Sequence, residues 1–175
     1  PVNQGENMKI TAVKPYQITV GEDSFIFVKV ETDEGIYGLG DADNLAMGRT
    51  MFEAITHLGR LIVGEDPLST ERLWQLMFRT VLYPGDRTIC SAISGIDTAL
   101  CFAVPNVAMG DATPGSSTLL WDIFPVQPTF EGGYMRRSEE PGLGIEFNEE
   151  AAQSYSYEPY LPPQFRIRDG SYYNW

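Results

Sequence analysis

The sequence is short of the side chains from which nucleophilic sites and many metal sites are built. Its 175 residues include one histidine and two cysteines. Any Ser-His-Asp or Cys-His scheme would have to use His57, which lies in a predicted helix, where most histidines are structural. Cys90 and Cys101 have neither metal-ligand spacing nor a disulfide framework, so we expect both to be small buried hydrophobic residues. The residues alone form no complete catalytic site.

Positive charge and long apolar runs are also scarce. The chain has 12 Lys and Arg against 24 Asp and Glu, a net charge of −12. A phosphate backbone needs a basic surface, so we expect no nucleic-acid partner, and we interpret the acidic surface as a source of solubility. No apolar run reaches the roughly 18 residues that span a bilayer, and no signal peptide opens the chain. We expect a cytoplasmic protein without membrane contact, in which residues 1–7 are a leader or a cloning remnant.

Three strands are predicted near the start of the chain. Residues 9–20 are rich in β-branched side chains, and Pro15 confines this strand to a sheet edge or a bend. Residues 24–31 alternate between two sets of side chains, and a turn at 33–35 leads into residues 36–39. The pattern predicts a three-stranded antiparallel sheet.

Three helices are expected to follow the sheet. The first covers residues 51–63 and ends at Gly64, the second is capped by Ser69 or Thr70, and the third starts near Arg87. The apolar positions of the third helix have the spacing of a buried face: Ile89, Ala92, Ile93, Ile96 and Leu100.

The second part of the chain differs in character. A hairpin is predicted over residues 129–135 around Gly132-Gly133, and Asn148 caps a brief helix. This part has little core of its own, so we expect it to lie across a larger body. The residues therefore indicate an α+β domain with an extended tail.

Three local motifs could carry binding chemistry. The stretch "GLGDAD" at 38–43 lacks the third glycine and the parallel βαβ unit of a dinucleotide site. The stretch "DADN" at 41–44 lacks the glycine and glutamate of a calcium loop. Asp86 and Arg87 could orient a polyhydroxylated ligand, but an N-cap aspartate followed by a solvated arginine explains them equally well.

Longer stretches resemble a known family. The segment "MKITAVKPYQITVGEDSFIFVKVETDEGIYGLGDA", with three helices ending in "SAISGIDTAL", resembles the N-terminal capping domain of the enolase superfamily, mandelate racemase/muconate lactonizing enzyme branch. The segments "VPNVAMGD", "FEGGYMRRSEEPGLGIEFNEEAAQSYSYEPYLP" and "DGSYYNW" resemble the C-terminal segment of the D-mannonate dehydratase and starvation-sensing group. The resemblance implies a capping domain at residues 8–100 and a post-barrel segment at 101–175 that packs on it.

The resemblance also implies that a domain is missing. In that family a TIM-type barrel of roughly 200 residues lies between the two parts, and here it would belong at or near Leu100–Cys101. We therefore expect a break in the chain within residues 98–104, and uncovered apolar faces on the third helix. The family uses Mg²⁺, whose ligands come from barrel strands, so we expect no catalytic or metal-binding residue in this chain.

Some residues of the implied substrate pocket remain. Tyr83 and Asp111 stand where the dehydratase group has Trp and Glu, and Trp175 matches a C-terminal Trp. Met47 takes the place of a substrate-facing Asn, with Asn44 nearby. The predicted pocket residues are Asn44, Tyr83, Arg87, Asp111 and Trp175. Ordinary packing is the alternative for Tyr83 and Trp175.

Two functions remain open. The resemblance implies that the complete protein is a Mg²⁺-dependent acid-sugar dehydratase (a hydro-lyase of the mannonate or gluconate type, and a homo-oligomer), and we expect the 175 residues alone to be inactive. Alternatively, the chain is a non-catalytic ligand- or partner-binding protein derived from the capping domain.

Overall fold

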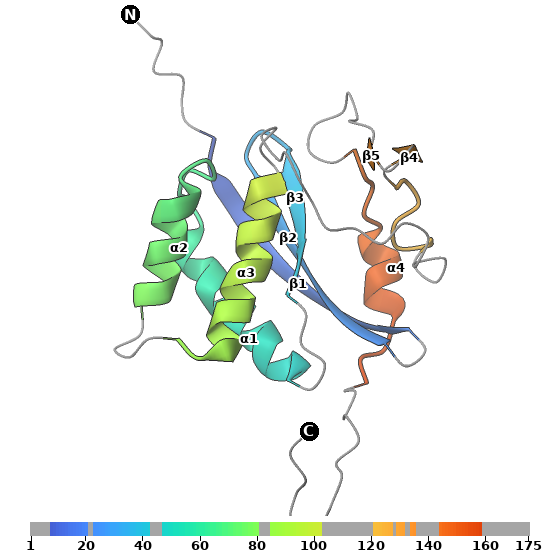
Figure 1. Cartoon of the computed structure of the whole chain (residues 1–175), viewed down its shortest axis with the longest axis horizontal. Coiled ribbons are helices and arrows are strands. Elements are labelled where there is room, and N and C mark those ends of the chain that lie inside the picture. The colour runs from blue at the N-terminus through green and yellow to red at the C-terminus, as the bar shows by residue number, and fades with distance from the viewer. Residues whose placement is uncertain are drawn as a thin grey trace, which may run out of the picture.

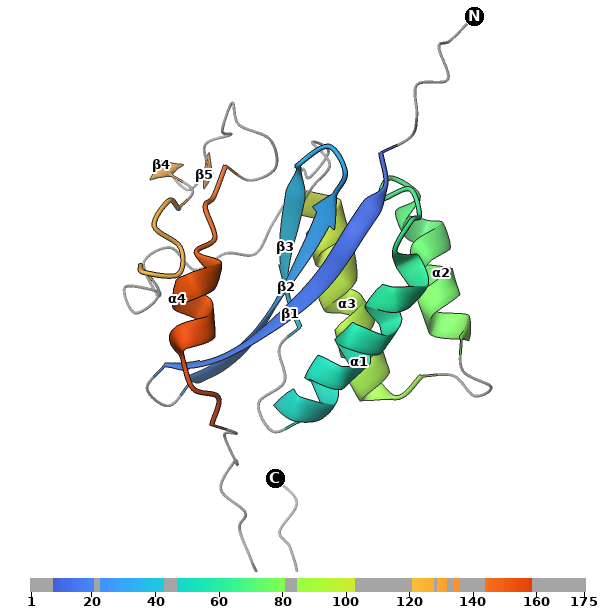
Figure 2. The ribbon, with the colours of Figure 1, turned by 180° about the vertical axis from the view of Figure 1, so that it is seen from behind.

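The fold is given by a computed structural model, which places three layers side by side (Figure 1). Its description covers residues 8–20, 23–42, 47–80, 85–102, 121–127, 129–131, 134–135 and 144–158. A three-stranded sheet lies between a layer of three helices and a C-terminal layer that contains a short fourth helix (Figures 1 and 2).

The sheet is antiparallel with the strand order β1-β2-β3. Its strands are β1 (Ile10–Val20), β2 (Asp23–Thr32) and β3 (Tyr37–Asp41). The turn between β2 and β3 holds Gly35 with φ of 77°, a conformation that glycine adopts without strain. Pro15 lies in the edge strand β1, so the predicted sheet and the predicted edge position are both confirmed.

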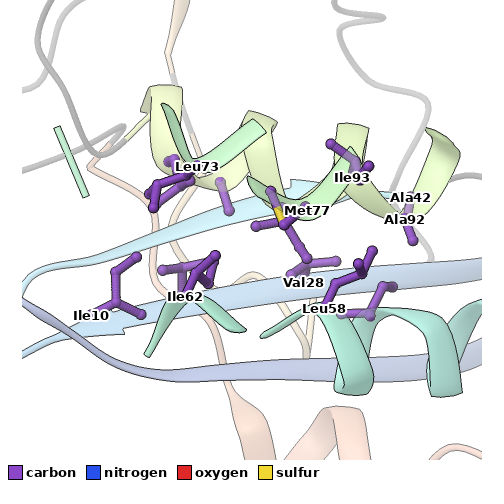
Figure 3. Packing of buried hydrophobic residues seen from close by; sticks show 14 of the residues in the cluster. Ile10, Val28, Ala42, Leu58, Ile62, Leu73, Met77, Ala92 and Ile93 are labelled. Atoms are coloured by element: carbon purple, nitrogen blue, oxygen red, sulfur yellow. The ribbon is translucent and has the colours of Figure 1, made fainter. Parts of the chain in front are cut away.

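Three helices cover one face of the sheet: α1 (Gly48–Ile62), α2 (Thr70–Arg79) and α3 (Arg87–Phe102). Helices α1 and α3 pack on the sheet and α2 packs on both of them, and full burial of a large aliphatic side chain stabilises a fold by about 1.5–3 kcal/mol. Figure 3 shows how these side chains gather over the sheet. The buried positions include Val28, Met51, Ile55, Leu58, Ile62, Leu73, Met77, Ile93 and Ile96.

The chain break predicted within residues 98–104 is wrong for 98–102, and residues 103–104 lie outside the described residues. Helix α3 runs through Leu100 and Cys101 and ends at Phe102. The expected exposure of its apolar face is also wrong, because β3, α1 and α2 pack against α3 and leave Leu100 only 1% exposed. The missing barrel itself is not contradicted. The apolar face of α3 belongs to the core of this domain.

The opposite face of the sheet is covered by the C-terminal part of the chain. Ile123 and Phe147 pack with Tyr16, Ile18 and Leu39 of the sheet. The expectation that the tail packs on a larger body is therefore confirmed, and α1–α3 and the tail lie on opposite sides of the sheet (Figures 1 and 2).

Two local predictions for the tail are confirmed as well. Strand β4 (Phe130–Glu131) pairs antiparallel with β5 (Tyr134–Met135). Helix α4 (Glu149–Ser154) follows Asn148, whose side-chain oxygen accepts a hydrogen bond from the Ala151 N–H at 3.1 Å.

Strand β3 and helix α3 meet at a contact that requires glycine on both sides. A Cβ on Gly40 would overlap the main-chain oxygen of Gly95. A Cβ on Gly95 would lie 2.6 Å from the Cβ of Ala42. Both obstacles are short or main-chain atoms, so no side-chain rotation relieves the overlap.

The Gly40→Ala variant tests this contact. We expect its free energy of unfolding to fall by about 1–3 kcal/mol, because the added methyl group pushes β3 away from α3. Urea titration followed by circular dichroism measures the loss. Ser94→Ala is the control, since Ser94 is exposed on α3. A Gly40→Ala protein as stable as the control would contradict the close packing.

Candidate functional site

Most of the predicted pocket residues fall in parts of the chain that the structure does not cover. Asn44, Tyr83, Asp111 and Trp175 lie outside the described residues. Arg87 lies within them, is exposed, and is the first residue of α3. The structure thus locates one of the five side chains, and the pocket role of all five stays a prediction.

Asp86 and Arg87 have different local roles. Asp86 Oδ1 accepts a hydrogen bond from the Ile89 N–H at 3.1 Å, and its main-chain oxygen accepts one from the Cys90 N–H at 3.0 Å. The aspartate therefore caps α3. Among the described residues Arg87 has no ion-pair partner, so its guanidinium group is available to an anionic ligand.

Arg87 lies at the end of the domain where β3 ends and α1 and α3 begin, which we call the helix-start end (Figures 1 and 2). Gln17 Nε2 donates a hydrogen bond to the main-chain oxygen of Gly48, the first residue of α1. The ring of Tyr157 lies against Gly48 so closely that a Cβ there would overlap the tyrosine hydroxyl. The tail therefore reaches the helix-start end through Tyr157.

Sequence analysis missed Tyr157 as a contact of this end. Its only signal was the aromatic composition of the tail. The Tyr157 hydroxyl is buried and has no hydrogen-bond partner within the described part of the chain.

A second polar arrangement lies between the sheet and α4. Glu149 accepts a hydrogen bond from the Tyr16 hydroxyl at 2.7 Å and forms an ion pair with Lys29. Glu31 Oε2 lies 2.9 Å from Lys14 Nζ, and Glu31 Oε1 lies 3.1 Å from Lys29 Nζ. Lys14 Nζ is also 3.9 Å from Glu149 Oε2. We call these five residues the tail cluster.

Hydrogen bonds and charges set the pKa values of the carboxylates in the tail cluster. The hydrogen bonds from Lys29 and then from Tyr16 hold the pKa of Glu149 below its ordinary value. Burial opposes the charge of Glu31, but hydrogen bonds from Lys14 and Lys29 outweigh it and lower its pKa too. Both carboxylates therefore stay ionised in the folded protein.

The pKa values of the two hydrogen-bond donors to Glu149, Lys29 and Tyr16, are raised. Burial opposes the charge of Lys29, but the hydrogen bonds and charges of Glu149 and Glu31 outweigh it and raise its pKa. Burial, and then the hydrogen bond to Glu149, raises the pKa of Tyr16. Every shift favours the protonation state that holds the cluster together. The cluster thus ties the tail to the sheet through hydrogen bonds and ion pairs.

The rarest side chains of the sequence do not converge. His57 is exposed on α1. Cys90 is exposed on α3, so the prediction that it is buried is wrong: its position points away from the stripe that faces the sheet. Cys101 is partly buried, and the desolvation raises the pKa of its thiol.

The described residues do not fit a Mg²⁺ ion. Nowhere in that part of the chain do three or more His, Cys, Asp or Glu side chains gather in a way that could hold a metal. Across the same residues, no helix has both the length and the apolar character required to cross a bilayer.

The three-stranded sheet and its layer of helices define the class of the domain, an enolase-type capping domain of the α+β class. The family model for the mandelate racemase / muconate lactonizing enzyme N-terminal domain matches residues 6–104. The chain belongs to this family of the enolase superfamily. The family predicted from the sequence is therefore confirmed.

Relatives match the chain over about half its length. D-galactonate dehydratases from Cronobacter sakazakii and Variovorax paradoxus are each 40% identical over 93 residues, which is 53% of this chain and 24% of theirs. An enolase from Pantoea ananatis, solved with bound D-gluconate and Mg, is 34% identical with a TM-score of 0.52, covering 54% of this chain and 23% of that one. The matched part thus spans about a quarter of each relative.

Alanine substitutions at Asp86 and Arg87 test separately the cap of α3 and the side chain of its first residue. We expect Asp86→Ala to lower the free energy of unfolding by about 1 kcal/mol, because the Ile89 N–H loses its acceptor. Arg87→Ala should stay within about 0.5 kcal/mol of the parent protein. Urea titration measures both. Equal losses in the two variants would show that Asp86 is not a specific cap.

Glu31 gives a pH-dependent prediction. Because its pKa is lowered on folding, it contributes stability above the unfolded-state pKa, and this contribution is lost as pH falls through the folded-state pKa. Glu31→Gln should therefore be less stable than the parent at pH 7, and the difference should shrink towards pH 3. Glu34→Gln, in the exposed turn, is the control. A difference that is the same at both pH values would refute this assignment.

Proposed function

We propose that the complete protein is an acid-sugar dehydratase of the enolase superfamily, and that this chain holds its capping and C-terminal parts, residues 8–100 and 101–175. The carrying observation is the 40% identity to D-galactonate dehydratases, together with the family membership. The substrate is an acid sugar of the mannonate or gluconate type. The proposal includes a cytoplasmic location and a homo-oligomeric assembly.

The chemistry of the superfamily defines what this chain contributes. The superfamily removes a proton next to a carboxylate, and a bound Mg²⁺ would supply stabilisation of the negative charge that results. We assign to this chain the covering of the substrate, in keeping with its match to the family's N-terminal domain. Arg87 at the helix-start end supports this, because it has no ion-pair partner among the described residues and a guanidinium binds carboxylates in a bidentate manner. We assign pocket lining to Asn44, Tyr83, Arg87, Asp111 and Trp175.

One observation favours a second function. The described layers cover both faces of the sheet without a barrel, as a self-contained binding domain would. In that case the chain is a non-catalytic ligand- or partner-binding protein. Intact mass of the natural gene product separates the two: about 19.5 kDa supports the binding protein. A mass roughly twice as large, from a barrel of ~200–250 residues, supports the dehydratase.

Activity assays provide the direct test. The 175-residue polypeptide should show no Mg²⁺-dependent dehydration of D-galactonate, D-gluconate or D-mannonate, because positioned carboxylates and a base within hydrogen-bond reach are both required. The intact gene product should dehydrate at least one of them. Turnover by the verified 175-residue chain that EDTA abolishes would overturn the assignment. Failure of the intact product on all acid sugars would favour the binding protein.

A further inference from the structure

The C-terminal residues 144–158 touch both the sheet and the first residue of α1. We propose that they form a latch. Glu149 holds the segment on the sheet, Tyr157 packs against Gly48 at the helix-start end, and these two contacts form and break together. The latch is independent of the dehydratase proposal, since it concerns only contacts within this chain. Released, it would uncover Gly48, the first residue of α1.

Helix α4 depends on docking for its structure. It has six residues, and a helix of that length is not stable in water by itself. Its packing comes from Phe147 and Ala152, which are 9% and 2% exposed against the outer sheet face. When these contacts are lost, the Asn148 cap alone cannot hold a helix of this length. Docking and folding of this segment are therefore one event.

Glu149 is the ionic attachment of the latch. Its carboxylate contacts Tyr16 and Lys14 of β1 and Lys29 of β2. Among the described residues, each ion pair between the tail and the sheet involves Glu149. Lys29 is only 8% exposed, so loss of Glu149 would leave two ammonium groups sharing Glu31 in a partly desolvated site.

The end of the latch, residues 156–158, is hydrogen-bonded to the tip of the β1–β2 hairpin. The Thr19 N–H donates to the main-chain oxygen of Ser156 at 3.2 Å, and the Glu158 N–H donates to Thr19 Oγ1 at 2.8 Å. Ser24 Oγ donates to the main-chain oxygen of Glu158 at 2.8 Å. Between these two anchored residues, Tyr157 is held against Gly48. The residues that contact Gly48 at the start of α1 therefore follow α4 directly and are held on the same sheet.

Hydrogen exchange of the full chain, read by mass spectrometry, tests the ionic attachment. We expect Glu149→Gln to accelerate exchange of peptides within residues 145–158 about tenfold, and to accelerate exchange at 47–52. The α3 amides should keep the parent rate, because opening is local. Glu150→Gln is the matched control, an exposed glutamate in the same turn of α4. Unchanged exchange at 145–158, equal acceleration by the control, or equal acceleration of α3 would each overturn the latch.

Gly48→Ala tests the contact between α1 and Tyr157 by changing the residue on α1. The three atoms nearest to a Cβ at Gly48 all belong to Tyr157, and alanine favours the helix, so the substitution acts on the tail contact. Exchange at 155–158 should rise about tenfold, while Arg49→Ala leaves it unchanged. Tyr157→Phe should slow or preserve exchange, because it removes a buried hydroxyl without a partner. Parent-like exchange at 155–158 in Gly48→Ala would refute the coupling.

Discussion

A three-stranded sheet with two apolar faces sets the constraint on which the structure depends. Side chains along a strand alternate between the faces, and β2 carries apolar residues on both. Ile26, Val28 and Val30 face the helices, whereas Phe25 and Phe27 face the tail. Neither face is stable against water, so the sheet requires two covering layers. The helices α1–α3 form one layer, and residues 121–127 and 144–158 contribute to the other.

One charged residue interrupts the apolar character of the sheet face that the tail covers, and this charge fixes the position of α4. Lys29 occupies an inward position on the tail side, is 8% exposed, and lies 4.4 Å from the centre of the Tyr37 ring. A buried ammonium group needs an anionic partner. Glu31, on the same strand, supplies one carboxylate and Glu149 supplies another. The aromatic contacts determine which face of the sheet the tail covers. The ion pair between Lys29 and Glu149 determines where along that face the tail lies.

Local patterns in the sequence were sufficient to predict the helices and strands. Periodicity predicted the sheet and the three helices, the missing N–H of Pro15 predicted the edge strand, and Asn148 predicted the start of α4. The same patterns failed where tertiary contacts decide. Cys90 was expected to be buried, although it is one position removed from the Ile89–Ile93 stripe. Position in a helix alone does not define which side is covered.

The contacts of the tail could not be predicted for a different reason. Glu149 meets Tyr16 and Lys29 across sequence separations of 133 and 120 residues, and no local spacing connects them. The contact of Tyr157 with Gly48 has no signal beyond aromatic composition. Of the candidate site, only Arg87 falls on an element whose start was predicted, so the sequence located its backbone but not its surroundings.

These contacts also explain why a barrel between the two parts is not needed to complete the described core. The apolar side of α3 is filled by β3, α1 and α2, and the outer sheet face is filled by the tail. Both interfaces use side chains of this chain alone. Within the described residues, the helix layer, the sheet and the tail therefore form one packing unit.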